Sequence, residues 1–310
     1  MRELIIDGKG NTRRVEAEPT EGIVVYQRKE LPEWREQVEE GIRRNNYRES
    51  VDPNQRKSIR IPLVTDRYTA IVFTGDWHIG AEGFAWEQWR DDMQMVMDNS
   101  DAKLFLMGDL IDNFTWFPGA FEQVMNPHEQ VALLLSFLDE AMGREKILGM
   151  VSGNHTAEWL LKNTGLEFAD IVTRFMRLPY LREGGLFYID TGQVIYTVLA
   201  RHRTRYNSSF NMQHGNRRAF HMEARADIVV SGHTHELGVS DEWLTADGKP
   251  FHTFMVKSGC YKIYDRYAKQ KGYPQRTVGS AVIIINPLNH ELYGVTGVER
   301  GLKILRALNE

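Results

Sequence analysis

The sequence contains almost no cysteine: Cys260 is the only one in 310 residues. An intramolecular disulfide framework is therefore excluded, and a single thiol is typical of a protein in a reducing compartment. Long apolar runs are also missing, because the longest, 131–138, is far too short to cross a bilayer. Acidic residues interrupt the apolar residues at the N-terminus, which is not typical of a signal peptide. We therefore expect a cytoplasmic protein with no membrane partner.

An excess of charge of either sign is absent as well. There are 38 Lys and Arg residues against 42 Asp and Glu residues, so the formal net charge is −4. No overall basic field would draw such a chain onto nucleic acid or an anionic membrane, and any contact with a polyanion must come from local patches or bound cations. The remaining composition, 42% hydrophobic and 26% charged, is that of an ordinary globular protein.

Strand-like and helical segments alternate regularly from about Tyr68 onwards. Strands predicted at 69–74, 103–107 and 146–151 are followed by helical stretches at 85–97, 127–142 and 157–176. This alternation predicts βαβ units and a largely parallel sheet. After residue 186 the chain becomes rich in strands, which are predicted at 186–190, 193–200, 226–230, 236–243, 251–256 and 278–285. The turn Thr191-Gly192 would join the first two as a hairpin.

The first 66 residues differ from the rest of the chain. They contain one strand-like run at 22–26, a charged helical stretch at 32–48 and a polar, linker-like stretch at 49–57. We expect residues 1–66 to form a small N-terminal accessory segment, and residues 67–310 to form the main domain with a C-terminal tail.

Five short segments rich in histidine and carboxylate follow predicted strands. They are Gly75-Asp76-Trp77-His78, Gly108-Asp109, Gly153-Asn154-His155, His202 and Gly232-His233-Thr234-His235. Ligands of α/β sheets bind outside the carboxyl ends of the strands, so these side chains are expected to converge. Three oxygen and four nitrogen donors without a thiolate disfavour a structural zinc site.

The residue types are those that a pair of cations requires. Asp76 and His78 are two apart in an extended segment and would share one cation. Asp109 has two carboxylate oxygens and can bridge two cations, while Asn154 offers a neutral oxygen where an anionic phosphate must enter. The two cations would activate a water molecule and neutralise phosphoryl oxygens, which predicts hydrolysis of phosphate esters. His155 is then available as the general acid for the leaving oxygen.

The ordered motifs D-x-H, G-D, G-N-H, H and G-H-x-H closely resemble those of the calcineurin-like metallophosphoesterases, in particular the branch of Mre11-type nucleases and phage phosphoesterases. The resemblance covers roughly residues 69–297. It implies a four-layer α/β/β/α sandwich of two mixed sheets flanked by helices. It also implies that one cation is held by Asp76, His78, Asp109 and His235, and the other by Asp109, Asn154, His202 and His233. Manganese is the expected metal, with zinc, iron and nickel as alternatives.

The sequence departs from the family pattern at two places. Thr156 stands where the family commonly has an acidic residue, so we expect the hydrogen bond to His155 to be absent or to come from elsewhere, with Asp112 as a candidate. The fourth motif reads Arg-His-Arg, and His214, which precedes a glycine, is a rival to His202. We favour His202 because it ends a strand-like run.

Basic residues near the fourth motif bear on the substrate. Arg201, Arg203 and Arg205 are expected to bind phosphate together with Asn113. The basic and aromatic stretch 261–271 would stack on unpaired bases, unless it is simply a solvated loop. These features favour a phosphodiesterase that cleaves DNA. A phosphatase or nucleotide phosphodiesterase, favoured by the near-neutral charge, and an inactive metal-binding scaffold are the alternatives. The oligomeric state stays open, a homodimer included.

Overall fold

The computed structural model describes residues 2–6, 12–16, 34–51, 58–113, 122–155, 161, 165, 168–205, 207–208, 210–263, 269, 272 and 277–310. The predicted strand at 22–26, most of the linker-like stretch at 49–57, Thr156 and most of the basic and aromatic stretch after residue 263 lie outside these residues.

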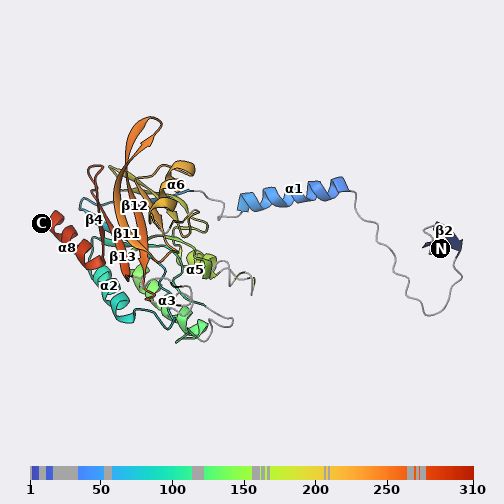
Figure 1. Cartoon of the computed structure of the whole chain (residues 1–310), viewed down its shortest axis with the longest axis horizontal. Coiled ribbons are helices and arrows are strands. Elements are labelled where there is room, and N and C mark those ends of the chain that lie inside the picture. Colours follow the sequence, from blue (N-terminus) through green and yellow to red (C-terminus); the bar gives the residue numbers. More distant parts are fainter. Residues whose placement is uncertain are drawn as a thin grey trace. The chain divides into compact units, whose positions relative to one another are not determined.

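The chain divides into two units, Met1–Asp52 and Pro53–Glu310. The smaller unit contains an antiparallel pair, β1 (Arg2–Ile6) and β2 (Thr12–Glu16), and the helix α1 (Trp34–Val51) (Figure 1). The sequence predicts the helix but not the pair of strands. In the larger unit, β3 (Ser58–Pro62) pairs in parallel with β8 (Gly185–Asp190). The residues just before 67, which the sequence assigns to the accessory segment, therefore belong to the larger unit.

Two mixed β-sheets form the larger unit. The first sheet has the order β13-β4-β5-β6-β7, with β14 beside β13. The second has the order β3-β8-β9-β10-β12, with β11 beside β12. The strands not yet bounded are β4 (Thr69–Thr74), β5 (Ala102–Leu106), β6 (Ile147–Val151), β7 (Tyr180–Leu181), β9 (Ile195–Arg201), β10 (Ile228–Ser231), β11 (Leu237–Ala246), β12 (Lys249–Cys260), β13 (Gly279–Ile285) and β14 (Leu292–Thr296). The two sheets meet where β12 pairs with β13 over only two residue pairs.

Both sheets combine parallel and antiparallel neighbours. Strands β4, β5, β6 and β7 are mutually parallel, whereas β13 is antiparallel to β4. In the second sheet β9, β10 and β12 are parallel, and β8 is antiparallel to β9 through the turn predicted at Thr191-Gly192. The inner faces pack on each other through a shared apolar core, in which the rings of Phe105 and Phe187 lie 4.8 Å apart. The two sheets therefore form a sandwich.

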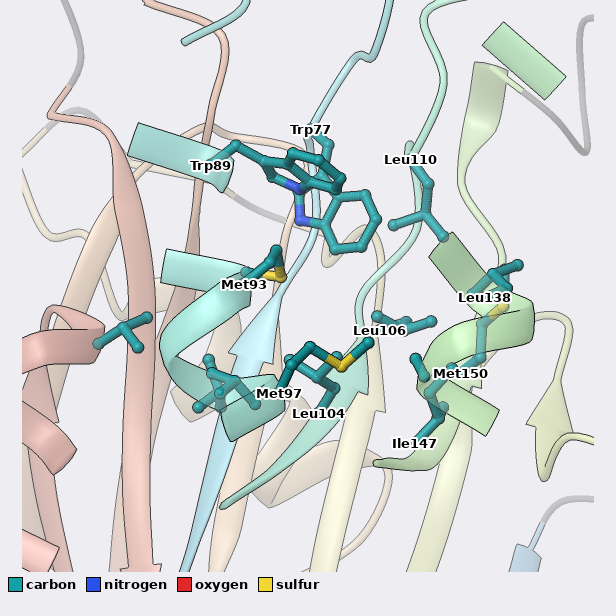
Figure 2. Packing of buried hydrophobic residues seen from close by; sticks show 14 of the residues in the cluster. Trp77, Trp89, Met93, Met97, Leu104, Leu106, Leu110, Leu138, Ile147 and Met150 are labelled. Carbon is teal, nitrogen blue, oxygen red and sulfur yellow. The ribbon is translucent and has the colours of Figure 1, made fainter. Parts of the chain in front are cut away.

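Helices cover the outer faces of the sandwich. On the first sheet lie α2 (Trp86–Asp98), α3 (Pro127–Gly143), α5 (Phe168–Met176) and α8 (Val298–Asn309). Figure 2 shows Met93 and Met97 of α2 and Leu138 of α3 beside Leu104 and Met150 of the sheet. On the second sheet, α6 (His214–Met222) buries Phe220 in a separate cluster. The predicted four-layer α/β/β/α sandwich of two mixed sheets is confirmed.

The central strands are buried on both faces, which explains their continuous apolar sequences. Every residue of β4 is buried, as expected of a strand between a helical layer and a second sheet. The helix α3 begins at Pro127 and carries a capping box formed by Asn126 and Glu129. Among the described residues, no helix is long and apolar enough to cross a membrane.

Candidate metal centre

The loops that leave β4, β5 and β6 meet the loops that leave β9 and β10 at one edge of the sandwich. Three groups of ligand-type side chains form there, and within each group the ligand atoms lie within 4.8 Å of one another. The groups are Asp76, His78 and His235; His78, Asp109 and His155; and Asp109, His202 and His233. The structure thus brings together seven side chains that the sequence singles out.

In the first group, Asp76, His78 and His235, the atoms that could bind a cation lie close to one another. Nδ1 of His78 donates to Oδ1 of Asp112 at 2.8 Å, so its Nε2 is unprotonated in the neutral ring and lies 3.0 Å from Nε2 of His235. Oδ1 of Asp76 lies 3.9 Å from the same His235 nitrogen. This Asp76 oxygen is buried and has no hydrogen-bond partner. A buried carboxylate oxygen without a partner is costly, and a cation between these atoms would remove that cost.

The group of Asp109, His202 and His233, called the second group below, has the same character. Nδ1 of His202 donates to the carbonyl of Met107 at 2.7 Å, which leaves Nε2 as an acceptor in the neutral ring. This Nε2 nevertheless faces two further acceptors at 3.1 Å, Oδ1 of Asn154 and Oδ2 of Asp109. Three acceptor atoms converge without a hydrogen between them unless a cation or a proton is bound. The donor set therefore fits a second cation.

Asp109 is placed to serve both groups. Its Oδ1 accepts a hydrogen bond from the backbone N–H of His155 at 2.9 Å, which fixes the carboxylate. Its Oδ2 faces His202, and Asp109 belongs to two of the three ligand groups. Asp109 could therefore contribute to holding a cation on either side.

The backbone at the centre is strained. Left-handed φ angles occur at Asp76 (46°), His78 (53°), Asp109 (47°), His233 (66°) and His235 (54°), although none of these is glycine. Such angles are uncommon for residues with a side chain, and they concentrate at functional sites. These five backbone conformations cost conformational free energy, and they set the direction of the five side chains.

Gly153 is required by the close packing around Asp109. A Cβ atom added at this position would lie 2.1 Å from Oδ1 of Asp109. The glycine of the third motif therefore makes room for the carboxylate that joins the two groups.

Burial holds the imidazoles of His233 and His235 in the neutral form that binds a cation. Burial, followed by the charge of His202, lowers the pKa of His233 to about 4. Burial, followed by the charge of Lys262, lowers the pKa of His235 to about 3. Both imidazoles are therefore neutral at physiological pH. Burial raises the pKa of Asp76 to about 7, although its Oδ2 accepts a hydrogen bond from the backbone N–H of His233.

His202 and Asp109 shift each other in opposite directions. Burial alone would lower the pKa of His202, but the neighbouring Asp109 carboxylate outweighs it and raises this pKa to about 9. Burial would raise the pKa of Asp109, but His202 and His155 hold it well below its usual range. In the absence of a cation, a proton is thus held between these two residues.

His155 lies beside both ligand groups and is held by its neighbours. Its Nδ1 donates to the backbone carbonyl of Asp112 at 2.5 Å. The side chain of Asn113 donates to the backbone carbonyl of His155 at 3.2 Å. Asp112, the candidate partner of His155, therefore does accept a hydrogen bond from it, though through its carbonyl. Asn113, expected to bind substrate, is instead buried and holds the backbone of His155.

The three arginines differ in their surroundings. Arg201 is held by Glu223, with Nη2 2.6 Å from Oε2, and it also donates to the carbonyl of Glu183. The guanidinium of Arg201 is therefore engaged by contacts within the protein. Arg203 and Arg205 are exposed, and they remain the candidates for phosphate contact.

His202, rather than His214, contributes to the ligand groups of the described residues. His214 is the first residue of α6, and its backbone N–H donates to the carbonyl of Asn211. The sequence predicts no helix at this position, because the polar composition of α6 hides its helical pattern.

Two residues at the centre are missed by the sequence. Gln123 and Lys262 both donate to the carboxylate of Asp112. Lys262 lies in the basic and aromatic stretch that the sequence analysis interprets as stacking on bases or as a solvated loop. Its position directly after a buried strand is the one signal that could have indicated burial.

The two-sheet sandwich and the Asp and His cluster at its edge define a metallophosphoesterase. Residues 69–237 match the family model described as calcineurin-like phosphoesterase, and the chain belongs to this family. The resemblance drawn from the five motifs is thereby confirmed.

Solved structures of low sequence identity also align with most of the chain. One is Vps29 from Entamoeba histolytica complexed with Zn²⁺, with 12% identity, a TM-score of 0.39, and coverage of 74% of this chain and 99% of that chain. Another is a predicted phosphoesterase from Streptococcus pneumoniae, with 13% identity, a TM-score of 0.34, and coverage of 75% and 99%. None of the curated protein sequences compared with the chain matches it.

Proposed function

We propose that this protein is a phosphodiesterase that uses two divalent cations, with manganese as the expected metal, to cleave DNA. The observation that carries the proposal is the meeting of two ligand groups, the first of Asp76, His78 and His235 and the second of Asp109, His202 and His233. Asp109 also lies within reach of His78 and His155. The first group would be completed by Asp109, and the second by Asn154, whose amide oxygen faces His202. When bound, the cations supply activation of a water molecule and neutralisation of charge on the phosphoryl oxygens.

His155 is assigned as the general acid. Its Nδ1–H is held by the carbonyl of Asp112, which accepts the same hydrogen bond whether or not the ring is charged. Its Nε2, 4.0 Å from Oδ2 of Asp109, faces the ligand cluster. From this position it would donate a proton to the leaving oxygen and so avoid the expulsion of an alkoxide.

The segment between β9 and α6 supports a polynucleotide as the substrate. It follows directly after His202 and carries the exposed side chains of Arg203 and Arg205. Phe210, in the same segment, is 100% exposed. Arginines bind phosphate oxygens through two parallel hydrogen bonds, and an exposed aromatic ring stacks on unpaired bases. A strand would therefore be held beside the cluster through its backbone and its bases.

The activity is tested with small esters and labelled DNA in the presence of Mn²⁺. We expect turnover of bis-p-nitrophenyl phosphate, weaker turnover of the p-nitrophenyl monoester, and cleavage of single- or double-stranded DNA. Asp109→Asn serves as the inactive control and should lose both bound metal, measured by mass spectrometry, and at least about 100-fold in rate. Turnover of the monoester with intact DNA would reject the nuclease.

The second candidate is a phosphatase or a nucleotide phosphodiesterase. The observation that favours it is the net charge of −4, which gives the chain no overall attraction for a polyanion. A salt series separates the two, because contacts with DNA phosphates weaken binding steeply as salt rises.

A further inference from the structure

A buried lysine lies behind the first ligand group. Lys262 is only 6% exposed, and its Nζ donates to Oδ1 of Asp112 at 3.1 Å. The same oxygen accepts the hydrogen bond from Nδ1 of His78 at 2.8 Å. An ammonium group and a candidate metal ligand thus meet on one carboxylate oxygen.

Asp112 connects this lysine to both sides of the centre. Its Oδ2 accepts from the side chain of Gln123, and its backbone carbonyl accepts from Nδ1 of His155. Asp112 therefore sets the orientation of a candidate ligand and of the candidate general acid together. Any shift of its carboxylate would turn the imidazole of His78.

Burial of the Asp112 charge requires compensation. The residue is 1% exposed, and a buried carboxylate is costly unless an opposite charge and hydrogen bonds accompany it. Lys262 supplies an opposite charge and a hydrogen bond to Asp112. Hydrogen bonds from an ammonium to a carboxylate are among the stronger ones in proteins.

The backbone that carries Lys262 is itself fixed. Lys262 forms an isolated β-bridge with Phe84, and the N–H of Ile263 donates to the carbonyl of Gly83 at 2.8 Å. The N–H of Tyr261 donates to the carbonyl of Asp76 at 3.1 Å. The ammonium group therefore approaches Asp112 from an anchored segment, and its burial argues against direct contact with a phosphate.

We propose that Lys262 is a positioning residue of the metal centre, which holds Asp112 in place and thereby keeps His78 and His155 aimed at the cluster. The inference rests on the proposed metal-dependent function of the same site. It adds the ammonium group of Lys262, which lies outside the five motifs, to the groups on which that function depends.

The test is titration of the full chain with Mn²⁺, followed by calorimetry and by electron paramagnetic resonance. Loss of a group that orients a metal ligand typically weakens metal binding by about 10- to 100-fold. We expect Lys262→Met to show such a loss at one of two sites, and Lys262→Arg to recover part of it. Wild-type affinity in Lys262→Met would overturn the proposal.

Lys146→Met is the matched control. Lys146 is also buried, 3% exposed, but it donates to the backbone carbonyls of Asn99 and Ala102 rather than to the metal centre. We expect this variant to lose thermal stability and to keep its affinity for Mn²⁺. An equal loss of affinity in both lysine variants would show a general effect of removing a buried charge, and it would overturn the proposal.

A double variant tests whether Lys262 acts through Asp112, and it remains informative if Lys262→Met fails to fold. Lys262→Gln combined with Asp112→Asn removes both charges and should bind Mn²⁺ no more weakly than Asp112→Asn alone. Additive losses would contradict the proposed route.

The outcomes separate this inference from the proposed function. If Lys262→Met weakens Mn²⁺ binding but the wild-type protein cleaves no diester, the positioning role stands and the phosphodiesterase does not. If the wild-type protein binds no Mn²⁺ at all, both are overturned.

Discussion

Nε2 of His202 lies 3.1 Å from Oδ2 of Asp109, and this contact raises the pKa of the imidazole to about 9 although burial opposes it. The proton held there by the metal-free protein occupies the position where the acceptors would face a cation. Binding of a cation must displace that proton, so affinity for the metal rises with pH.

The stability of the metal-free protein should depend on pH through His202. Its pKa is about 9 when folded against 6.5 for the free side chain. A raised histidine pKa contributes stability that is complete below pH 6.5 and is lost as the pH rises through 9. We expect the chelator-treated wild-type protein to have a higher free energy of unfolding than chelator-treated His202→Gln. This difference should be larger at low pH than above pH ~9 by on the order of 2–3 kcal/mol. Denaturant titration measures it, and a pH-independent difference would contradict it.

Gly153→Ala should disable the metal centre. The added Cβ would lie 2.1 Å from Oδ1 of Asp109, so the bridging carboxylate must move. We expect loss of bound Mn²⁺, measured by mass spectrometry, and a destabilisation of about 1–3 kcal/mol from overpacking. Gly143→Ala is the control, because nothing lies within 4 Å of its added Cβ. It should bind metal normally and unfold at an equal or higher temperature.

Arg203 and Arg201 should behave differently when each is changed to alanine. Arg203 is exposed near the cluster, whereas the guanidinium of Arg201 is held by Glu223. We expect Arg203→Ala to raise KM for DNA more than KM for bis-p-nitrophenyl phosphate, and to reduce the salt dependence of DNA binding by about one unit of slope. Arg201→Ala should leave both KM values unchanged and cost at most about 1 kcal/mol of stability. Equal effects of Arg203→Ala on the two substrates would argue against contact between Arg203 and a DNA strand.

His155→Ala should keep its metals and lose rate selectively. The ring contacts the carbonyl of Asp112 and faces the cluster, but the groups Asp76, His78 and His235 and Asp109, His202 and His233 do not include it. Removal of a general acid typically costs about 10²- to 10⁴-fold, and the loss should be largest for poor leaving groups. A series of aryl and alkyl diesters measures the dependence on the pKa of the leaving group. A uniform loss across the series, or loss of bound Mn²⁺, would point instead to a ligand role.

The sequence predicts the elements that the core buries most completely. Strands such as β4 are apolar on both faces because helices cover one face and a second sheet the other. The helix α6 is not predicted, because its nine residues are mostly polar and only one face meets the sheet. β3 is not predicted either, since only Ile61 among its residues is buried.

The motifs locate the ligand types but not the direction of every side chain. Asn113 has a suitable amide near the centre, yet its contacts turn it inward to the backbone of His155. Arg201 has a suitable charge, yet Glu223, 22 residues further along the chain, holds it. Lys262 becomes visible only when the end of β12 is placed beside Asp112. Each of these outcomes depends on pairing between distant segments, which local patterns do not encode.

The ligand groups combine residues from both sheets, and this has a consequence for the stability of the sandwich. Asp76 and Asp109 follow strands of the first sheet and His202 and His235 follow strands of the second. Between the sheets, the described backbone pairing is limited to two residue pairs of β12 and β13, and the remaining contact is the shared apolar core. A cation bound by residues from both sheets would therefore cross-link the sheets, and its binding free energy would stabilise the sandwich against unfolding. At a metal concentration 1,000-fold above Kd this reinforcement amounts to about 4 kcal/mol, a sizeable part of what keeps a typical domain folded.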